Sequence, residues 1–292
     1  MKKITLTHQT SSGSQLKATF LPEHGMNLVS YQKDGVEVIA QSTWNLFEER
    51  HAGLGALIGP HFHRRLPELI QPVKHEERFP HIAKVKAKGI AEPFSHGIAR
   101  YAPWQVESSE QTIQAHLFGK DLWQGVPLKE LEGQDFQISF LISLKEEGLH
   151  FNLAIESELP SLMGLHYYYH LPKGPALVKS RVKNQGPIHS SFPPSTVDVK
   201  MDQGQYLDFD LNQEVDSTFY PYPDPLQSEV ILQTTEYELS TRYRCANEEN
   251  CWQLYHPKEA SFVCIEPMSS KDPRHPKQTF SQLEVQLKIT LP

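Results

Sequence analysis

Three separated segments of the sequence carry side chains that can transfer protons. They hold His96 within residues 96–100, His166 within residues 164–169 and Glu266 within residues 263–267. Two imidazoles and one carboxylate can run acid and base catalysis without a cofactor, because one group donates a proton while another accepts one. We expect the acid and the base to lie on opposite sides of a substrate, supplied by distant parts of the chain.

Short strands must position these groups, since alternation of apolar and polar residues is the dominant pattern in the sequence. The clearest run covers residues 282–289, and residues 136–144 and 149–155 alternate around a turn as a β-hairpin does. Shorter runs of the same kind occur at residues 16–21, 26–32, 36–40, 104–107, 112–117, 230–233 and 261–265. The pattern predicts an all-β sandwich without a long amphipathic helix.

Two proline-containing stretches, residues 59–81 and 186–225, interrupt this pattern and are interpreted as loops. They carry Arg64, Arg65 and Asp216 among aromatic residues, which is typical of loops that line a site on a rigid scaffold. The sequence has no repeat and no linker-like tract, so we expect a single domain over residues 1–292.

The composition excludes several classes of protein. Lys and Arg number 28 against 35 Asp and Glu, and the net charge of -7 has the wrong sign for a nucleic-acid binder. The three cysteines lack a paired spacing, which suits a reducing compartment. No stretch has membrane-spanning length or the apolar core of a secretory signal. We expect a cytoplasmic protein that binds neither nucleic acid nor membranes, and its oligomeric state stays open.

Five motifs, in this order along the chain, resemble those of the aldose 1-epimerase (galactose mutarotase-like) superfamily, nearest the branch of hexose-6-phosphate mutarotases. They are Leu21-Pro22-Glu23-His24-Gly25-Met26-Asn27-Leu28, His96-Gly97-Ile98-Ala99-Arg100 with Trp104, Gly164-Leu165-His166-Tyr167-Tyr168, Val215-Asp216-Ser217-Thr218-Phe219 and Cys264-Ile265-Glu266-Pro267. Each motif alone is weak, whereas their shared order is specific. The resemblance implies a galactose mutarotase-like β-supersandwich.

The resemblance also implies a role for individual residues. Glu266 would be the general base, His166 the general acid and His96 a second imidazole near the ring oxygen, while Asp216 and Arg65 would grip hydroxyls. The implied enzyme is an isomerase that interconverts the α and β anomers of an aldose. It removes the proton of the anomeric hydroxyl while protonating the ring oxygen, which requires no metal and no other cofactor. We therefore expect Glu266 to be at least partly desolvated.

A phosphate on the sugar is an open alternative within this function. Arg64, Arg65 and Arg100 could supply guanidinium groups for it. Residues 59–65 depart from the Gly-Arg pair usual in relatives, so the sequence leaves open which of Arg64 and Arg65 faces the site. The nearby residues 84–88 alternate Lys with apolar residues and are interpreted as a solvated strand face.

Simpler interpretations also stay open for single residues. His166 alternates with its neighbours as a core histidine would, His96 precedes a glycine as a turn residue would, and Asp216 suits a turn. Arg100 and Trp104 could merely stack on each other.

Two other functions fit parts of the sequence. Gly55, His61, His63 and Glu68 reproduce the spacing of the first metal motif of cupins, although His75 stands where that motif has a glycine. A non-catalytic carbohydrate-binding sandwich is the other alternative, since a fold does not guarantee turnover.

Overall fold

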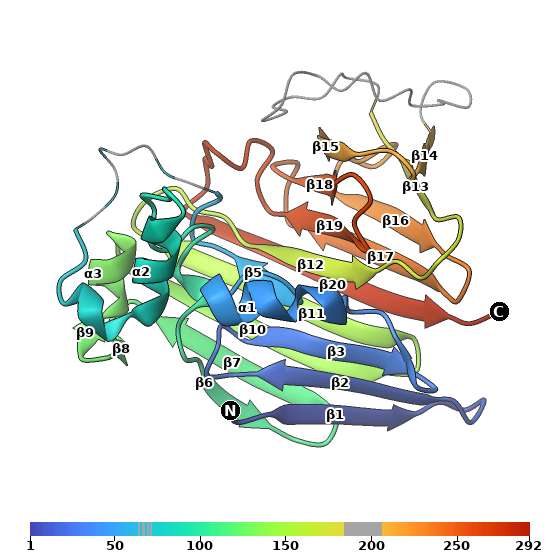
Figure 1. Cartoon of the computed structure of the whole chain (residues 1–292), viewed down its shortest axis with the longest axis horizontal. Helices are drawn as coiled ribbons and strands as arrows, with labels where there is room; N and C mark the ends of the chain where they lie inside the picture. Colours follow the sequence, from blue (N-terminus) through green and yellow to red (C-terminus); the bar gives the residue numbers. More distant parts are fainter. Residues whose placement is uncertain (64, 66–67, 69, 71, 184–205) are drawn as a thin grey trace.

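The computed structural model describes the chain apart from residues 64, 66–67, 69, 71 and 184–205. Its strands form two large antiparallel sheets (Figure 1). The first, here called sheet A, runs in the order β1 (Ile4–Gln9), β2 (Gln15–Leu21), β3 (Asn27–Lys33), β5 (Gly55–Ile58), β12 (Gly164–His170), β19 (Phe262–Met268), β18 (Cys251–His256) and β15 (Val215–Phe219), with β4 (Val36–Glu37) beside β3.

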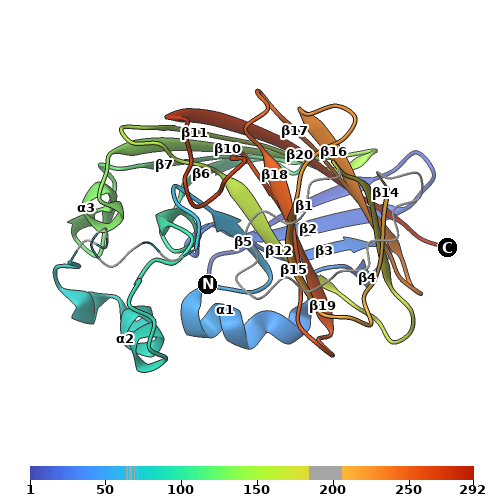
Figure 2. The ribbon, with the colours of Figure 1, turned by 90° about the horizontal axis from the view of Figure 1, so that it is seen from above.

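The second sheet, here called sheet B, packs against sheet A as the other layer of a sandwich (Figure 2). Its order is β14 (Tyr206–Asp210), β13 (Leu177–Arg181), β16 (Gln227–Gln233), β17 (Glu238–Cys245), β20 (Phe280–Thr290), β11 (Gly148–Ser157), β10 (Phe136–Lys145), β7 (Thr112–Phe118) and β6 (Gln105–Ser108). A small separate ribbon pairs β8 (Leu122–Trp123) with β9 (Val126–Pro127). The predicted all-β sandwich is confirmed.

The alternating runs form strands because one face of each is apolar. In β10, Phe136, Ile138, Phe140, Ile142 and Leu144 are all buried in the core between the sheets. β11 pairs with β10 as the expected hairpin and shares this core. Burying such a row removes its apolar surface from water, which is the main force that holds the two layers together.

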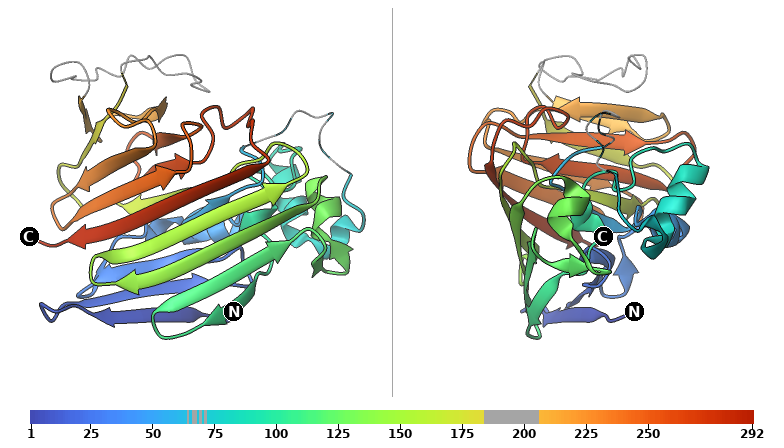
Figure 3. Two further views of the ribbon diagram at one scale, coloured as in Figure 1. Left: turned by 180° about the vertical axis from the view of Figure 1, so that it is seen from behind. Right: turned by 90° about the vertical axis from the view of Figure 1, so that its left-hand side faces the viewer.

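The helices are short and lie outside the sandwich. They are η1 (Gln41–Thr43), α1 (Trp44–Arg50), η3 (Glu76–Arg78), α2 (Pro80–Ala87), η4 (Ile98–Arg100) and α3 (Leu128–Glu132). α1 lies along the outer side of sheet A, whereas α2 and α3 lie beyond one end of the strands (Figures 1 and 3). Within the described residues, no helix has the length and apolar character needed to cross a membrane.

Three expectations about local structure are wrong. Residues 84–88 belong to α2 and its last turn, because Pro80 fits the first position of a helix and starts one there. The stretch 186–225 includes the strands β14 and β15 in its described part. The strand expected over residues 261–265 is β19, which continues through Pro267 to Met268, since Trp252 of β18 still pairs opposite Pro267.

Candidate active site

The alternation of four strands in sheet A separates the core from a cavity. One set of side chains packs between the sheets, namely Leu165, Tyr167, Tyr169, Val215, Trp252, Leu254, Val263 and Ile265. The residues that alternate with these along the strands lie on the opposite face of sheet A and line a cavity. They are His166, Tyr168, Asp216, Thr218, Gln253, Tyr255 and Glu266. The floor of the cavity therefore comes from β12, β19, β18 and β15.

Loops and helices close the sides of this cavity, which has a volume of about 440 Å³. Its walls include Arg50 at the end of α1, the segment around His96, Arg100 of η4, and Arg274. Small-molecule sites in proteins fall in this range of volume. The cavity brings together His96, Arg100, His166, Asp216 and Glu266 from the residues that the sequence singled out.

His166 and Glu266 are direct neighbours across two paired strands. The register of β12 and β19 pairs Gly164 with Met268 and Tyr167 with Ile265, which puts His166 opposite Glu266. Nε2 of His166 lies 3.4 Å from Oε1 of Glu266. The two groups therefore act from the same side of a ligand, and the expectation that they lie on opposite sides is wrong, because no ligand fits between them.

Burial controls the protonation of this pair. Glu266 is 1% exposed and His166 is 8% exposed. Burial raises the pKa of Glu266 well above its ordinary value, as the nearby Asp216 also does, whereas Arg100 opposes the rise. Burial likewise lowers the pKa of His166 well below its ordinary value, with a further contribution from the charge of Arg100. Both shifts favour the uncharged forms, which are a protonated Glu266 and an unprotonated His166.

His96 stands beside the pair in a fixed tautomer. Its ring meets that of His166 edge to face, with centroids 5.1 Å apart. The backbone N–H of His63 donates to Nδ1 of His96 over 3.2 Å. Because Nδ1 accepts this bond, the neutral ring carries its proton on Nε2. Burial lowers the pKa of His96 well below its ordinary value, which favours the neutral ring with Nε2–H as its available donor.

The backbone around His96 is held in an unusual conformation. His96 has φ +68° and Gly97 has φ +86°. The N–H of Gly59 donates to the carbonyl of His96 over 2.8 Å, and the N–H of His96 donates to the carbonyl of His63 over 3.0 Å. A β-carbon at Gly97 would come within 2.0 Å of the Gly59 carbonyl oxygen, so the close approach of these two segments requires glycine there.

Arg100 and Asp216 complete the polar lining. Arg100 is 3% exposed, donates from Nε to the carbonyl of Leu57 over 2.9 Å, and leaves Nη2 buried without a hydrogen-bond partner among the described residues. Asp216 lies in β15, where Gln253 donates to its carboxylate. Burial raises the pKa of Asp216. The turn interpretation of Asp216 is thus wrong. The interpretation of Arg100 as mere packing against Trp104 leaves out its contact with the cavity.

The two other arginines that the sequence singled out are not part of the described cavity lining. Arg65 lies outside it, with Nε 2.9 Å from Oε2 of Glu92 and Nη1 2.6 Å from the carbonyl oxygen of Glu132. Arg64 falls outside the described residues. The contacts of Arg65 show that its guanidinium is engaged within the protein.

Sequence reasoning missed Arg50, Gln253 and Tyr168. Gln253 could have been found, since it alternates with the buried Trp252 and Leu254 on a strand. The Tyr168 ring stacks on His166 with centroids 5.0 Å apart, and it stands inside a motif that was read only for its histidine. No sequence signal marks Arg50, because a cation in the last turn of a helix is common.

One group of side chains among the described residues could hold a metal ion, namely His166, Cys264 and Glu266, whose ligand atoms lie within 4.8 Å of one another. Burial raises the pKa values of the Cys264 thiol and the Glu266 carboxyl well above the ordinary ones. Metal ligation requires the thiolate and the carboxylate. A metal ion at this position would therefore have to displace protons that burial favours on both groups.

The cupin alternative is wrong. His61 contacts Glu132, whereas the ring of His63 packs against that of His96, so the two histidines do not converge on a shared ligand position. Glu68 is exposed.

Comparisons with known proteins bear on the fold. No model of a protein family matches the chain, and no curated protein matches it. Among solved structures, a putative aldose 1-epimerase from Escherichia coli K12 superposes with a TM-score of 0.63 at 14% identity, covering 99% of this chain and 100% of that one. A galactose mutarotase-like protein from Lactobacillus casei ATCC 334 gives a TM-score of 0.66 at 13% identity, with 99% and 100% covered.

A third structure agrees with these two. The GalM/aldose epimerase homologue from C. elegans gives a TM-score of 0.65 at 13% identity, covering 99% of both chains. Likeness at such low identity establishes the fold and leaves activity and substrate to be argued from the site. The chain has the galactose mutarotase-like fold that its motifs implied.

Proposed function

We propose that this protein, whose fold is that of galactose mutarotase-like proteins, is an aldose 1-epimerase that interconverts the α and β anomers of a sugar. The observation that carries the proposal is the buried pair of His166 and Glu266, 3.4 Å apart in a cavity of small-molecule size. The whole chain, residues 1–292, acts in this proposal as one cytoplasmic domain.

The spacing of the pair suits the anomeric centre of a sugar. A pyranose carries two oxygens on its anomeric carbon, the hydroxyl and the ring oxygen, and these lie close together because one atom bonds both. Two adjacent groups that share one proton can contact both oxygens from the same side. One group takes the proton of the hydroxyl while the other gives a proton to the ring oxygen, and the ring opens.

We assign Glu266 as the base and His166 as the acid in this opening step. The assignment places the shared proton on His166 when the ring opens. Arg100 favours the carboxylate form of Glu266, whereas burial and the charge of Arg100 disfavour a protonated His166, so this form of the pair is higher in energy than the form with the proton on Glu266. Closure on the other face of the open-chain carbonyl exchanges the two roles, so the pair ends with the single proton with which it began. The Nε2–H of His96 supplies a neutral donor next to His166, suited to the oxygen that gains negative charge during opening.

We further propose that the sugar carries a negative group such as the phosphate of a hexose 6-phosphate. Arg50 and Arg100 both line the cavity. Nε of Arg50 and Nη2 of Arg100 are buried without a hydrogen-bond partner among the described residues. Burial raises the pKa of Asp216, which makes its carboxyl a poor counter-ion, and the carboxyl of Glu266 already pairs with His166. An anion on the ligand would balance these guanidinium groups.

The activity is tested by NMR exchange between the anomers of a panel of free and phosphorylated aldoses. Glu266→Gln keeps the shape of the side chain but removes its basicity, and we expect kcat to fall by about 10²- to 10⁴-fold. Glu156→Gln is the matched control, because Glu156 is exposed on β11, and it should keep the wild-type rate. A wild-type rate no faster than the uncatalysed one for every sugar, with sugar binding retained, would instead identify a carbohydrate-binding sandwich.

The role of Arg50 is tested with one phosphorylated sugar and its free counterpart. Arg50→Gln should raise KM for the phosphorylated sugar by about 10-fold or more, the size of a lost charge-assisted hydrogen bond. KM for the free sugar should change little. The exposed Arg181 of β13 offers the control substitution Arg181→Gln. Equal changes for both sugars would remove Arg50 from anion recognition.

A further inference from the structure

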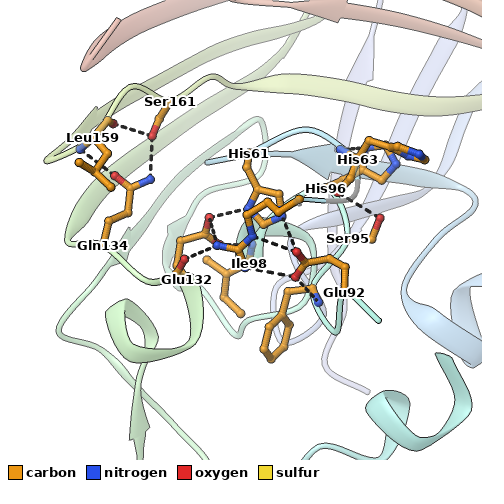
Figure 4. A network of polar contacts seen from close by, with 12 residues as sticks. His61, His63, Glu92, Ser95, His96, Ile98, Glu132, Gln134, Leu159 and Ser161 are labelled. Atoms are coloured by element: carbon orange, nitrogen blue, oxygen red, sulfur yellow. Dashed lines mark hydrogen bonds and ion pairs between the residues drawn. The ribbon is translucent and has the colours of Figure 1, made fainter. Parts of the chain in front are cut away.

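A cluster of charged side chains lies buried beside the cavity but outside its described lining. It consists of His61, Arg65, Glu92 and Glu132, and Figure 4 shows how His61, Glu92 and Glu132 lie. Glu92 is 1% exposed and Glu132 is 2% exposed. Buried carboxylates are costly unless they are paired and hydrogen-bonded, so a cluster of two needs an explanation in function or folding.

Glu132 joins three segments of the chain. Its Oε1 lies 2.6 Å from Nδ1 of His61, and its Oε2 accepts the backbone N–H of Ile98 over 3.1 Å. Its carbonyl oxygen accepts a bond from Nη1 of Arg65 over 2.6 Å. Glu132 itself ends α3. One residue therefore ties α3 to the segment of residues 61–65 and to the segment that carries His96.

Glu92 makes the corresponding links on the other side. Arg65 donates to it with Nε over 2.9 Å and with Nη2 over 3.1 Å, which is a two-pronged contact. Its Oε1 also accepts the backbone N–H of Phe94 over 3.3 Å. Such paired charge-assisted bonds fix the orientation of the guanidinium relative to the carboxylate as well as the distance between them.

These contacts hold the chain on both sides of His63 and on both sides of His96, the two residues whose hydrogen bond sets the tautomer of His96. Phe94 and Ile98 lie on either side of His96, and each is bound through its backbone by one of the two carboxylates. His61 and Arg65 lie on either side of His63, and each is bound through its side chain. His63 and His96 are in turn joined by the bond from the His63 N–H to Nδ1 of His96.

We propose that Glu132, together with Glu92, Arg65 and His61, forms a positioning cluster that holds the His63 N–H against Nδ1 of His96 and so keeps the ring proton of His96 on Nε2. The catalytic consequence rests on the proposed epimerase function, whereas the effect on the His96 tautomer does not. Glu132 is a positioning residue in this proposal, since it acts through His63 and Ile98 and is not among the residues that line the cavity.

The test uses Glu132→Gln in the full chain. The amide keeps the volume of the side chain but replaces one acceptor oxygen with a donor, so it cannot accept from both His61 and Ile98. We expect kcat to fall by about 10- to 100-fold while KM changes less, because a small displacement of a catalytic group from its productive position slows the chemical step more than it weakens binding. The control is Glu130→Gln on the same helix, where Glu130 pairs with Lys74 at the surface.

A second readout reports the tautomer directly. In protein with ¹⁵N-labelled histidine, the wild type should show His96 with an unprotonated Nδ1 and a protonated Nε2, assigned with His96→Gln. Glu132→Gln should mix the two tautomers, and Glu130→Gln should not. This readout remains valid if the wild type has no epimerase activity, so the two proposals can fail separately. An unchanged His96 tautomer in a folded Glu132→Gln protein would overturn the positioning role.

Arg65→Lys covers the case in which Glu132→Gln does not fold. Lysine keeps the positive charge near Glu92 but loses the two-pronged contact and the bond to the Glu132 carbonyl. It should shift the His96 tautomer in the same direction by a smaller amount. Arg65→Lys with the wild-type tautomer and the wild-type kcat would contradict the proposal, because the cluster would then be needed for folding alone.

Discussion

Acidification from pH 7 to pH 5 should destabilise the fold through His51, which is half-buried, and His81, which is buried. His51 follows α1, and His81 lies in α2; their rings meet edge to face with centroids 5.6 Å apart. Burial lowers the pKa of His51 to about 3, aided by the charges of His81 and His24. Burial also lowers the pKa of His81 to about 4. The folded protein therefore keeps both rings neutral at pH 5.

The unfolded chain behaves differently, since its histidines take up protons near their ordinary pKa of 6.5. Between that value and the folded pKa values, the unfolded state binds more protons than the folded state. The contribution of each histidine to stability is thus complete above pH 6.5 and is lost as the pH falls toward 4 and 3. At pH 5 the loss is about 2 kcal/mol for each ring, as a difference of one pKa unit corresponds to about 1.4 kcal/mol.

The assay is urea unfolding at pH 7 and pH 5. The variant His51→Asn removes one titrating ring, and asparagine tolerates the positive φ of +56° at this position. It should lose about 2 kcal/mol less than the wild type between the two pH values. His75→Asn is the control, because His75 has φ +58° but is exposed. Equal losses in the wild type and His51→Asn would refute the reasoning.

Two further predictions concern the catalytic pair and the segment beside it. Because the pKa of Glu266 is raised and that of His166 is lowered, kcat should stay level across neutral pH. It should fall only at pH values below the ordinary imidazole pKa and in alkali. A fall in kcat centred on the ordinary histidine pKa would contradict this. Gly97→Ala should lower the unfolding free energy by at least about 2 kcal/mol more than Gly13→Ala, because both have positive φ but only Gly97 faces a close backbone atom. Thermal or urea unfolding checks this, and equal losses would show that φ strain alone matters.

The sequence predicted the sandwich because its strands are amphipathic. β10, β11 and β20 alternate over long runs, and their buried faces follow the pattern residue by residue. α2 was missed because its lysines alternate with apolar residues over only a few positions, too few to separate a helix from a strand. β15 was missed because it is short and lies among prolines.

The sequence also indicated which residues meet at the site but could not predict how they meet. The adjacency of His166 and Glu266 depends on the register between two strands that are far apart in the sequence, and a shift by one residue would put one of them into the core. The contacts of Arg65 with Glu92 and Glu132 depend on loops whose conformation no periodicity encodes. Arg50 reaches the cavity only because α1 ends at its rim.

The central claim is that His166 and Glu266 pass a single proton at the anomeric carbon of a sugar. NMR magnetisation exchange between the two anomeric H1 signals of a hexose 6-phosphate measures this step without a coupled assay. The exchange rate should rise in proportion to the concentration of wild-type protein, and the increment due to protein should fall by about 10²- to 10⁴-fold with Glu266→Gln. Exchange at the protein-free rate with wild-type protein, for this sugar and for its free counterpart, would contradict it.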